Sequence, residues 1–300
     1  MKKNVLLTIA YDGSTFHGWQ KQPGERTVQG YLEQTMSHLF DREIQLSGTS
    51  RTDAGVHAFG QRASFRTDIG IPTEKLVLVV NNALCAREGH ESGRGGFAKS
   101  PVRILKAEEM PESFHARFDS KGKKYIYRIC AGVGACLQSA EPDEAQRSLI
   151  FERNYVYHVD DRLDVQAMDS AAKYFEGEHD FKSFEASGGN PRETTVRRMM
   201  RAGVRESGAD TVDGADAVDG EDMDGVVDTE SGSGLQRIEY TIEGEGFLYN
   251  MVRIMTGTLV EVGRGKRRPE EIPEIIEAAD RQRAGHTAPP GGLYLAEVFY

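Results

Sequence analysis

An order of strand-like and helix-like segments, which occurs twice along the chain, most constrains its fold. The first series has five segments: strands at 5–10, 44–50 and 61–67, and helices at 27–40 and 72–84. A similar series follows, with strands at 102–107, 125–130, 199–205, 235–242 and 293–299, and helices at 165–175, 246–262 and 269–279. Two mixed series predict an α+β fold, with antiparallel sheet covered by helices on one face. We place the two halves at residues 1–107 and 108–300.

The first predicted helix has the clearest pattern of apolar residues. Thr27 is expected to cap its N-terminus, because a threonine hydroxyl accepts a hydrogen bond from the first turn. One face of this helix is expected to be buried, and it comprises Val28, Leu32, Met36, Leu39 and Phe40.

Composition permits a sizeable core and argues against a membrane protein. The chain has 300 residues, of which 38% are hydrophobic. Its longest apolar runs, such as residues 76–80, fall far short of the roughly 20 residues of a membrane-spanning helix. The chain opens without the apolar stretch of a secretory signal, so we expect a cytoplasmic protein. Cys85, Cys130 and Cys136 have neither metal-site nor disulfide spacing, and we expect buried thiols.

Net charge is −10, and one segment accounts for all of it. Residues 206–234 hold ten of the 47 acids and no lysine or arginine, which leaves 37 acids against 37 bases elsewhere. Because this segment is poor in large apolar residues and lies between two predicted strands, we interpret it as a mobile insertion at a hairpin tip. The neutral remainder has basic clusters, including residues 121–124 and 264–268, and so permits an anionic ligand.

The stretch from Gly48 to Ala58 has the composition of a functional loop. It combines small residues with Asp53, Arg51 and His57 between two predicted strands. A catalytic aspartate must stay ionised in a partly desolvated pocket, and a nearby arginine supports this by lowering its pKa. The same letters are also good turn chemistry, so spacing alone leaves catalysis and a capped turn both open.

Arg253 is a second candidate, because it is a cation within a largely apolar predicted helix. Such an arginine either pairs with an acid or ligand, or extends its guanidinium to solvent. Arg253 and Arg51 are therefore the candidate partners of Asp53.

Residues 121–128 interleave bases with two tyrosines on a predicted strand. Tyr125 and Tyr127 share one face of that strand, where a nucleic-acid base could stack, and Lys124 would neutralise phosphates. Tyrosines on strands also pack simply against the core, which is the alternative interpretation.

Other site motifs are absent from the sequence. There is no phosphate-binding glycine loop and no paired Cys/His spacing, so we expect neither a nucleotide cofactor nor a metal. A hydrolase built on Ser50, His57 and Asp53 would lack the usual nucleophile motif.

Taken together, these segments resemble the TruA family of bacterial tRNA pseudouridine synthases over nearly the whole chain. The similar motifs occur in the family's order: YDG at 11–13, FHGWQ at 16–20, TVQ at 27–29, RTDAGVH at 51–57, FHARF at 114–118, KYIY at 124–127, FKSF at 181–184, NMVR at 250–253 and GLYL at 292–295. Two stretches depart from the pattern, namely the acidic segment 206–234 and a longer stretch at 87–100. Both put any RNA contacts near them in doubt.

The resemblance implies a fold, an activity and roles for named residues. Two ferredoxin-like halves would form one antiparallel sheet with a central catalytic cleft. Asp53 would be the catalytic aspartate, Arg253 its partner, Tyr125 the aromatic stacked on the target uracil, and Arg51 the residue that helps extrude the nucleotide. His57, Tyr127 and Lys124 are further candidate substrate contacts.

The resemblance also implies the reaction and the partners. The family isomerises uridine to pseudouridine at positions 38 to 40 in the anticodon arm of tRNA, as a homodimer without a cofactor. A catalytically silent RNA-binding module and the hydrolase are the alternatives to this enzyme.

Overall fold

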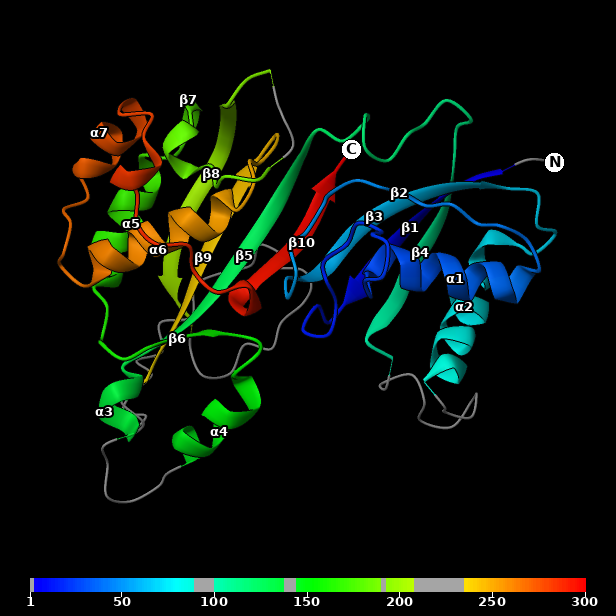
Figure 1. Ribbon diagram of the computed structural model, residues 1–300, viewed down its shortest axis with the longest axis horizontal. Coiled ribbons are helices and arrows are strands. Elements are labelled where there is room, and N and C mark those ends of the chain that lie inside the picture. Colours follow the sequence, from blue (N-terminus) through cyan, green and yellow to red (C-terminus); the bar gives the residue numbers. More distant parts are fainter. Residues whose placement is uncertain (1–2, 89–99, 138–143, 190–192, 208–234) are drawn as a thin grey trace, which may run out of the picture.

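The computed structural model describes residues 3–88, 100–137, 144–189, 193–207 and 235–300. A ten-stranded sheet forms the centre of the described part, with its main strands in the order β4-β1-β3-β10-β5-β9-β8-β7 (Figure 1). The strands are β1 Lys3–Tyr11, β2 Ser47–Gly48, β3 His57–Thr67, β4 Val102–Met110, β5 Gly122–Ala131, β6 Tyr157–Val159, β7 Gly177–Asp180, β8 Val196–Glu206, β9 Gln236–Gly244 and β10 Leu293–Phe299.

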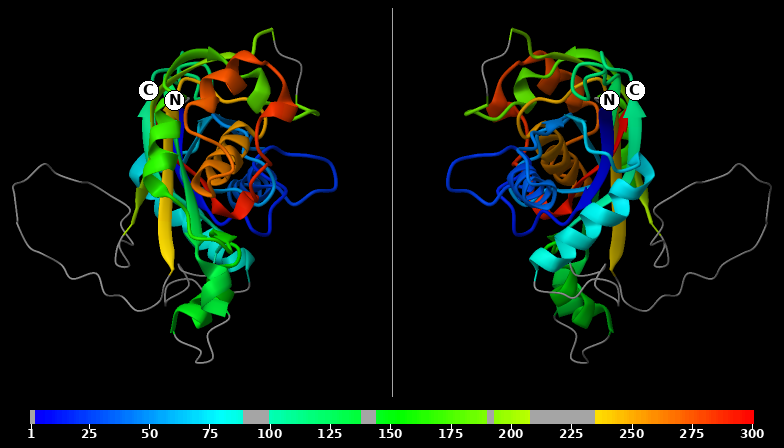
Figure 2. Two further views of the ribbon diagram at one scale, coloured as in Figure 1. Left: turned by 90° about the vertical axis from the view of Figure 1, so that its left-hand side faces the viewer. Right: turned by 90° about the vertical axis from the view of Figure 1, so that its right-hand side faces the viewer.

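The helices are α1 Val28–Phe40, α2 Thr73–Arg87, α3 Val133–Leu137, α4 Glu144–Glu152, α5 Val165–Lys173, α6 Met251–Gly263 and α7 Glu271–Glu277. Seen edge-on, α1 and α6 lie on the same side of the sheet (Figure 2). We call this helix-covered side the inner face and the opposite side the outer face. One core cluster on the inner face contains residues of α1, α2, α5, α6 and α7 together with those of the main strands.

The C-terminal strand β10 joins the two halves. It pairs with β3 of the first half, where Tyr294 is opposite His57, and with β5 of the second half, where Tyr294 is opposite Ile126. The predicted α+β fold with one extended sheet is confirmed. The sheet is mostly antiparallel, but β10 runs parallel to β3 and β6 runs parallel to β5.

Several predicted bounds are wrong for identifiable reasons. The strand expected at 44–50 shrinks to β2, because side chains of α1 bind its backbone: Ser37 accepts from the Ile44 N–H, and Glu33 from the Leu46 N–H. The strand expected from residue 61 begins at His57. The helix expected from 246 begins at Met251, since the preceding Asn250 is left-handed with φ 58°.

The strand near 102–107 belongs to the first half, because β4 pairs with β1. It runs to Met110, so the boundary that we place at 107 falls within it. Strands β6 and β7 and helices α3 and α4 have no counterpart among the predicted segments.

Other local predictions are confirmed. Thr27 accepts a hydrogen bond from the Gly30 N–H at 3.3 Å, and its helix buries Val28, Leu32 and Met36, whereas Leu39 and Phe40 are only partly buried. Cys85 and Cys130 are buried, whereas the Cys136 side chain lies outside the described part. Strands β8 and β9 pair up to Glu206, but the acidic segment between them (208–234) and residues 89–99 of the longer stretch lie outside the described residues.

Candidate active site

Residues 49–56, here called the Asp53 loop, are held by backbone contacts with the segment that follows β1. The Trp19 N–H donates to the Thr52 carbonyl at 3.1 Å, and the Gly55 N–H donates to the Phe16 carbonyl at 3.2 Å. This approach requires Gly18, because a Cβ there would lie 2.3 Å from the Thr52 carbonyl oxygen. The motifs at 11–13 and 16–20 therefore serve to support the Asp53 loop.

Buried hydrogen bonds fix the first half of this loop. The Tyr11 hydroxyl lies 2.7 Å from the Thr52 hydroxyl, and the Gln61 side chain donates to the Ser50 carbonyl at 2.8 Å. Burial raises the pKa of Tyr11 above its ordinary value, so this phenol stays neutral and can donate. The loop is thus set before any ligand binds.

Asp53 faces Arg253 across the junction of the two halves. The Arg253 Nη1 lies 3.5 Å from the Asp53 Oδ2, and the two side chains are 16% and 25% exposed. Arg253 also donates from Nε to the Ala288 carbonyl and from Nη1 to the Asn250 side chain, each at 2.7 Å. These contacts hold the guanidinium in place, and the remaining exposure of Asp53 leaves it open to a ligand.

Burial and Arg253 act on the Asp53 carboxyl in opposite directions. Desolvation raises its pKa and the Arg253 charge lowers it, and the net result is a pKa above the usual value. Arg253 therefore lowers the pKa of Asp53, as expected for a nearby arginine, but burial raises this pKa by more. Burial leaves this carboxyl group poorly solvated, which suits a base or nucleophile, and Arg253 favours its ionised form.

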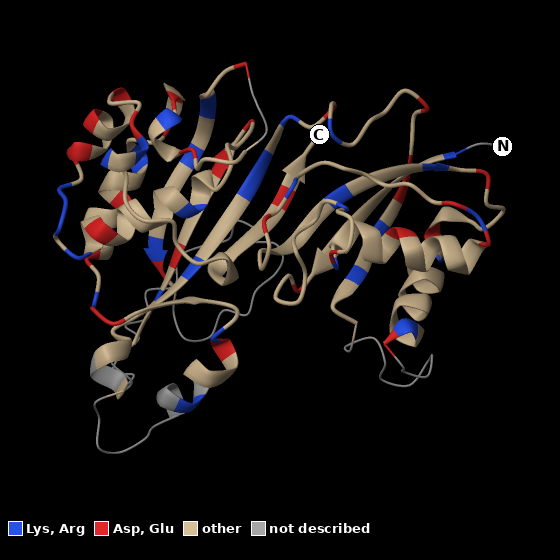
Figure 3. Ribbon diagram, in the orientation of Figure 1, with Lys and Arg blue, Asp and Glu red and all other residues tan. Residues whose placement is uncertain are grey.

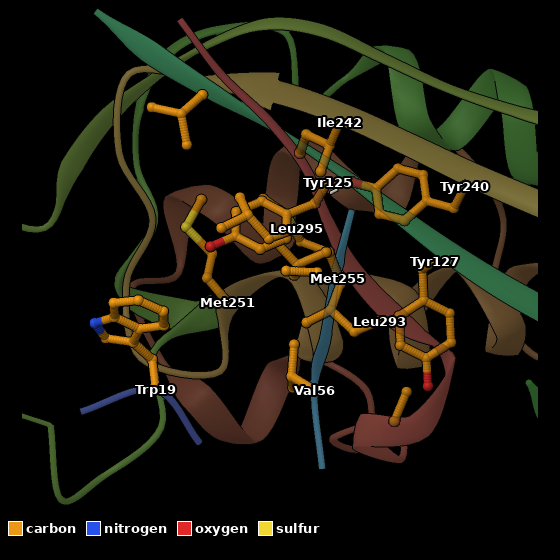
Figure 4. Close-up of a cluster of buried hydrophobic side chains, with 14 of the residues drawn as sticks. Trp19, Val56, Tyr125, Tyr127, Tyr240, Ile242, Met251, Met255, Leu293 and Leu295 are labelled. Atoms are coloured by element: carbon orange, nitrogen blue, oxygen red, sulfur yellow. Dashed lines mark hydrogen bonds between the residues drawn. The ribbon is translucent and has the colours of Figure 1, made fainter. Parts of the chain in front are cut away.

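Tyr125 projects from β5 onto the inner face and packs beside the site. It is 7% exposed, and its ring meets Phe247 edge to face with the centroids 5.0 Å apart. Burial, with a smaller contribution from the Asp53 charge, raises the pKa of Tyr125 to about 12. Figure 4 shows Tyr125 in a cluster with Met251 and Met255 of α6. The structure thus brings Asp53, Arg253 and Tyr125 together.

Tyr127 lies on the same inner face but belongs to the core. It is fully buried, and its hydroxyl donates to the Pro289 carbonyl at 2.5 Å. Because the neighbouring Ala288 carbonyl accepts from Arg253, Tyr127 supports the segment that holds that guanidinium. A substrate contact with Tyr127 has no support in this geometry.

His57 projects to the outer face, away from Tyr125. It is 2% exposed, stacks on Tyr294 with the ring centroids 4.8 Å apart, and Tyr294 also contacts Arg128. Its Nδ1 lies 3.1 Å from the Gly13 nitrogen and 3.3 Å from the Asp12 carboxylate, and its Nε2 lies 3.0 Å from the Asn154 carbonyl oxygen. The structure therefore does not bring His57 to the site, and the hydrolase arrangement with Ser50 is not assembled.

Lys124 also projects to the outer face, because it alternates with Tyr125 along β5. It lies opposite Glu243 of β9, with Nζ 3.6 Å from the carboxylate. Arg128, on the same face, pairs with Glu239 in the same way. Figure 3 shows lysine and arginine positions along β5, and acids of β9 pair with Lys124 and Arg128 of that strand.

Arg51 is an exposed residue of the Asp53 loop, and its Nε donates to the Gln20 side chain at 3.2 Å. Sequence reasoning missed Gln20, Asn250 and the Ala288 carbonyl as supports of the two arginines. Gln20 and Asn250 both lie in motifs given above, so the sequence could have identified them. The role of a backbone carbonyl cannot be predicted from the sequence, because every residue has one.

The described residues contain no group of three or more His, Cys, Asp or Glu side chains arranged to hold a metal ion. Within them, no helix has both the length and the apolar character needed to cross a membrane.

Comparisons with known proteins identify the family of this chain. A family model described as tRNA pseudouridine synthase matches residues 7–119 and 171–300. A protein of Clostridium perfringens named tRNA pseudouridine synthase A 2 is 38% identical over 99% of this chain and 100% of its own length. One of Ruminiclostridium cellulolyticum named tRNA pseudouridine synthase A is 39% identical, with the same coverage. The chain therefore belongs to the tRNA pseudouridine synthase family and is an enzyme that isomerises uridine in tRNA.

Proposed function

We propose that this enzyme forms pseudouridine at positions 38 to 40 in the anticodon arm of tRNA, with Asp53 as the catalytic carboxylate. The observation that carries the proposal is the Asp53–Arg253 pair, 3.5 Å apart at the junction of the halves. Tyr125 lies beside this pair, and all three residues occupy the motifs that resemble the TruA family.

The reaction is an isomerisation, so its atoms balance within the substrate. The N1–C1′ bond of uridine breaks, the uracil turns, C5 bonds to C1′, and the proton lost from C5 is balanced by one gained at N1. An ionised Asp53 can begin this by attacking C1′, by removing the C2′ proton, or by attacking the base. Each route needs a poorly solvated carboxylate, which is the state that burial and Arg253 give to Asp53.

Arg51 and Tyr125 supply what base extrusion requires. A uridine in the anticodon arm must leave its stack, which costs a few kcal/mol, and contacts in the pocket offset this cost. The ring of Tyr125 lies beside the Asp53–Arg253 pair and would stack on the extruded base. Arg51 is exposed, so its guanidinium can contact the RNA backbone or fill the vacated place. His57, Tyr127 and Lys124 are not part of this proposal.

The test uses an unmodified tRNA transcript with uridine at positions 38, 39 and 40, incubated with the enzyme and mapped by carbodiimide-dependent stops. A matched transcript has cytidine at those three positions. Product in the first transcript and none in the second is expected. Product elsewhere would overturn the proposed positions, and product formed by Asp53→Asn at the wild-type rate would overturn the role of Asp53.

We also propose that the enzyme acts as a homodimer. Sedimentation velocity of the purified chain at micromolar concentration tests this, because a single species at 33.2 kDa would contradict it.

A further inference from the structure

A chain of polar side chains links the interior of the first half to Arg51. It starts at Glu33 on α1, which is 6% exposed, and continues through Gln29, which is 9% exposed, and then Gln20. Gln29 donates to the Glu33 carboxylate at 3.0 Å, Gln20 donates to the Gln29 side-chain oxygen at 2.9 Å, and Arg51 donates to Gln20 at 3.2 Å.

The amide of Gln29 can adopt only one orientation. Its Nε2 donates to Glu33 and to the Leu46 carbonyl, both of which are acceptors. Its Oε1 accepts from Gln20 and from the Lys21 N–H at 3.0 Å. Flipping the amide would set donor against donor and acceptor against acceptor at a buried site, which is costly.

This orientation fixes that of Gln20. Because the Gln29 oxygen needs a donor, the Gln20 nitrogen must face Gln29, and the Gln20 oxygen is left to face Arg51. The Arg51 Nε uses this oxygen, so four of the five guanidinium N–H groups, on the two terminal nitrogens, stay available to a ligand. Among the described residues, Gln20 is the partner that the structure gives to this guanidinium.

We propose that Gln20 is a positioning residue that holds Arg51 for contact with tRNA. The inference rests on the proposed role of Arg51 in nucleotide extrusion. An exposed arginine has several rotatable bonds and loses conformational freedom when it binds RNA. Because the hydrogen bond at Nε already holds the side chain, less freedom is lost on binding. Glu33 and Gln29 act only through Gln20, since they keep its oxygen turned toward Arg51.

A double-mutant cycle tests the proposal on the full-length enzyme with unmodified tRNA. Total pseudouridine is counted at every position, so the outcome does not depend on positions 38 to 40. Gln20→Ala is expected to lower kcat/KM about threefold to tenfold, as for loss of one partly exposed hydrogen bond to a charged group. Arg51→Ala should lower kcat/KM more than Gln20→Ala does. In both variants the loss should be divided between kcat and KM in the same proportion. In the Arg51→Ala background, Gln20→Ala should have no further effect.

Each possible result of the cycle supports or overturns the positioning role of Gln20. Additive losses, or a Gln20→Ala enzyme with wild-type kcat/KM, would overturn the inference while leaving the role of Arg51 intact. An Arg51→Ala enzyme with wild-type kinetics would overturn both. The matched control is Gln45→Ala, which removes an exposed glutamine whose side chain donates to Glu43, and wild-type kinetics are expected for it.

Discussion

The inner and outer faces of the sheet differ sharply where the two halves meet. On the inner face, Tyr125 is beside the Asp53–Arg253 pair, and all three side chains are substantially buried. On the outer face, Lys124 projects from the same strand and is neutralised by Glu243. Neighbouring residues of one strand therefore have opposite surroundings. Closeness in sequence says little about which of them can meet a substrate.

Within the inner face, the two halves make different contributions. The first half brings Asp53 on a loop held by backbone hydrogen bonds, whereas the second brings Arg253 and Tyr125 on a helix and a strand. In the proposed mechanism, the reacting group thus comes from one half, and the groups that set its charge and support the base come from the other. If the proposed site is correct, neither half contains all of it, and activity depends on the junction that β10 forms between β3 and β5.

Loss of the Asp53 carboxylate should give the largest effect on this face. Asp53→Asn keeps the size of the side chain but removes the ionised oxygen, so kcat should fall by at least about 10³-fold. Dissociation constants for tRNA should change by less than about tenfold, because this group acts in the transition state. Single-turnover kinetics and filter binding measure the two quantities. Unchanged turnover would remove Asp53 from the mechanism.

Substitution of Arg253 should have the next largest effect and should alter the pH profile. Arg253 lowers the pKa of Asp53, so Arg253→Met should raise that pKa further. Activity needs ionised Asp53 and is lost as pH falls through the raised pKa, so the acid limb of kcat/KM should move to higher pH. We expect a loss of about 10²-fold at neutral pH.

Arg253→Lys is the control for this prediction. It keeps the charge but not the combined contacts of Nε and Nη1, so its acid limb should shift less than that of Arg253→Met. Identical limbs in the wild type and Arg253→Met would show that the pair does not control ionisation of Asp53.

Tyr125 should contribute through its ring more than through its hydroxyl. Tyr125→Leu removes the aromatic surface, and kcat/KM should fall about tenfold to a hundredfold, the range for loss of one stacked base. Tyr125→Phe keeps the ring and should retain most activity. Equal losses in the two variants would instead assign the role to the phenol, which lies near Ser50 and Asp53.

The sequence singled out these three residues as candidates, but their local chemistry left a capped turn, a solvent-exposed arginine and core packing open. Only the order of the motifs that resemble the TruA family implied that they act together. The faces of His57 and Lys124 were harder to predict. The strand that we expected from residue 61 begins at His57, and on a strand each step of one residue reverses the face. Lys124 was grouped with Tyr125 as a patch, although alternation separates them.

Prediction from local sequence patterns is limited in the same way for the fold. Local periodicity predicts both series of strands and helices, but it does not encode the position of β10 between β3 and β5. That position depends on long-range pairing, in which Tyr294 lies opposite His57 and Ile126. Strand β2 is short because Glu33 and Ser37 of α1 bind the adjacent backbone, a contact that propensity does not reveal.

Substitution of Lys124 should have the smallest effect on activity, and it tests directly whether the inner and outer faces differ in function. Lys124→Ala removes a side chain 34% exposed on the outer face, paired with Glu243 across the strands. Such pairs are worth about 0–1 kcal/mol, so the melting temperature should change little. Because its charge points away from Tyr125, kcat/KM should stay within about twofold of wild type at low salt, where a lost phosphate contact would be most visible. A large loss that salt diminishes would show that RNA also reaches the outer face, and the functional separation of the two faces would then be wrong.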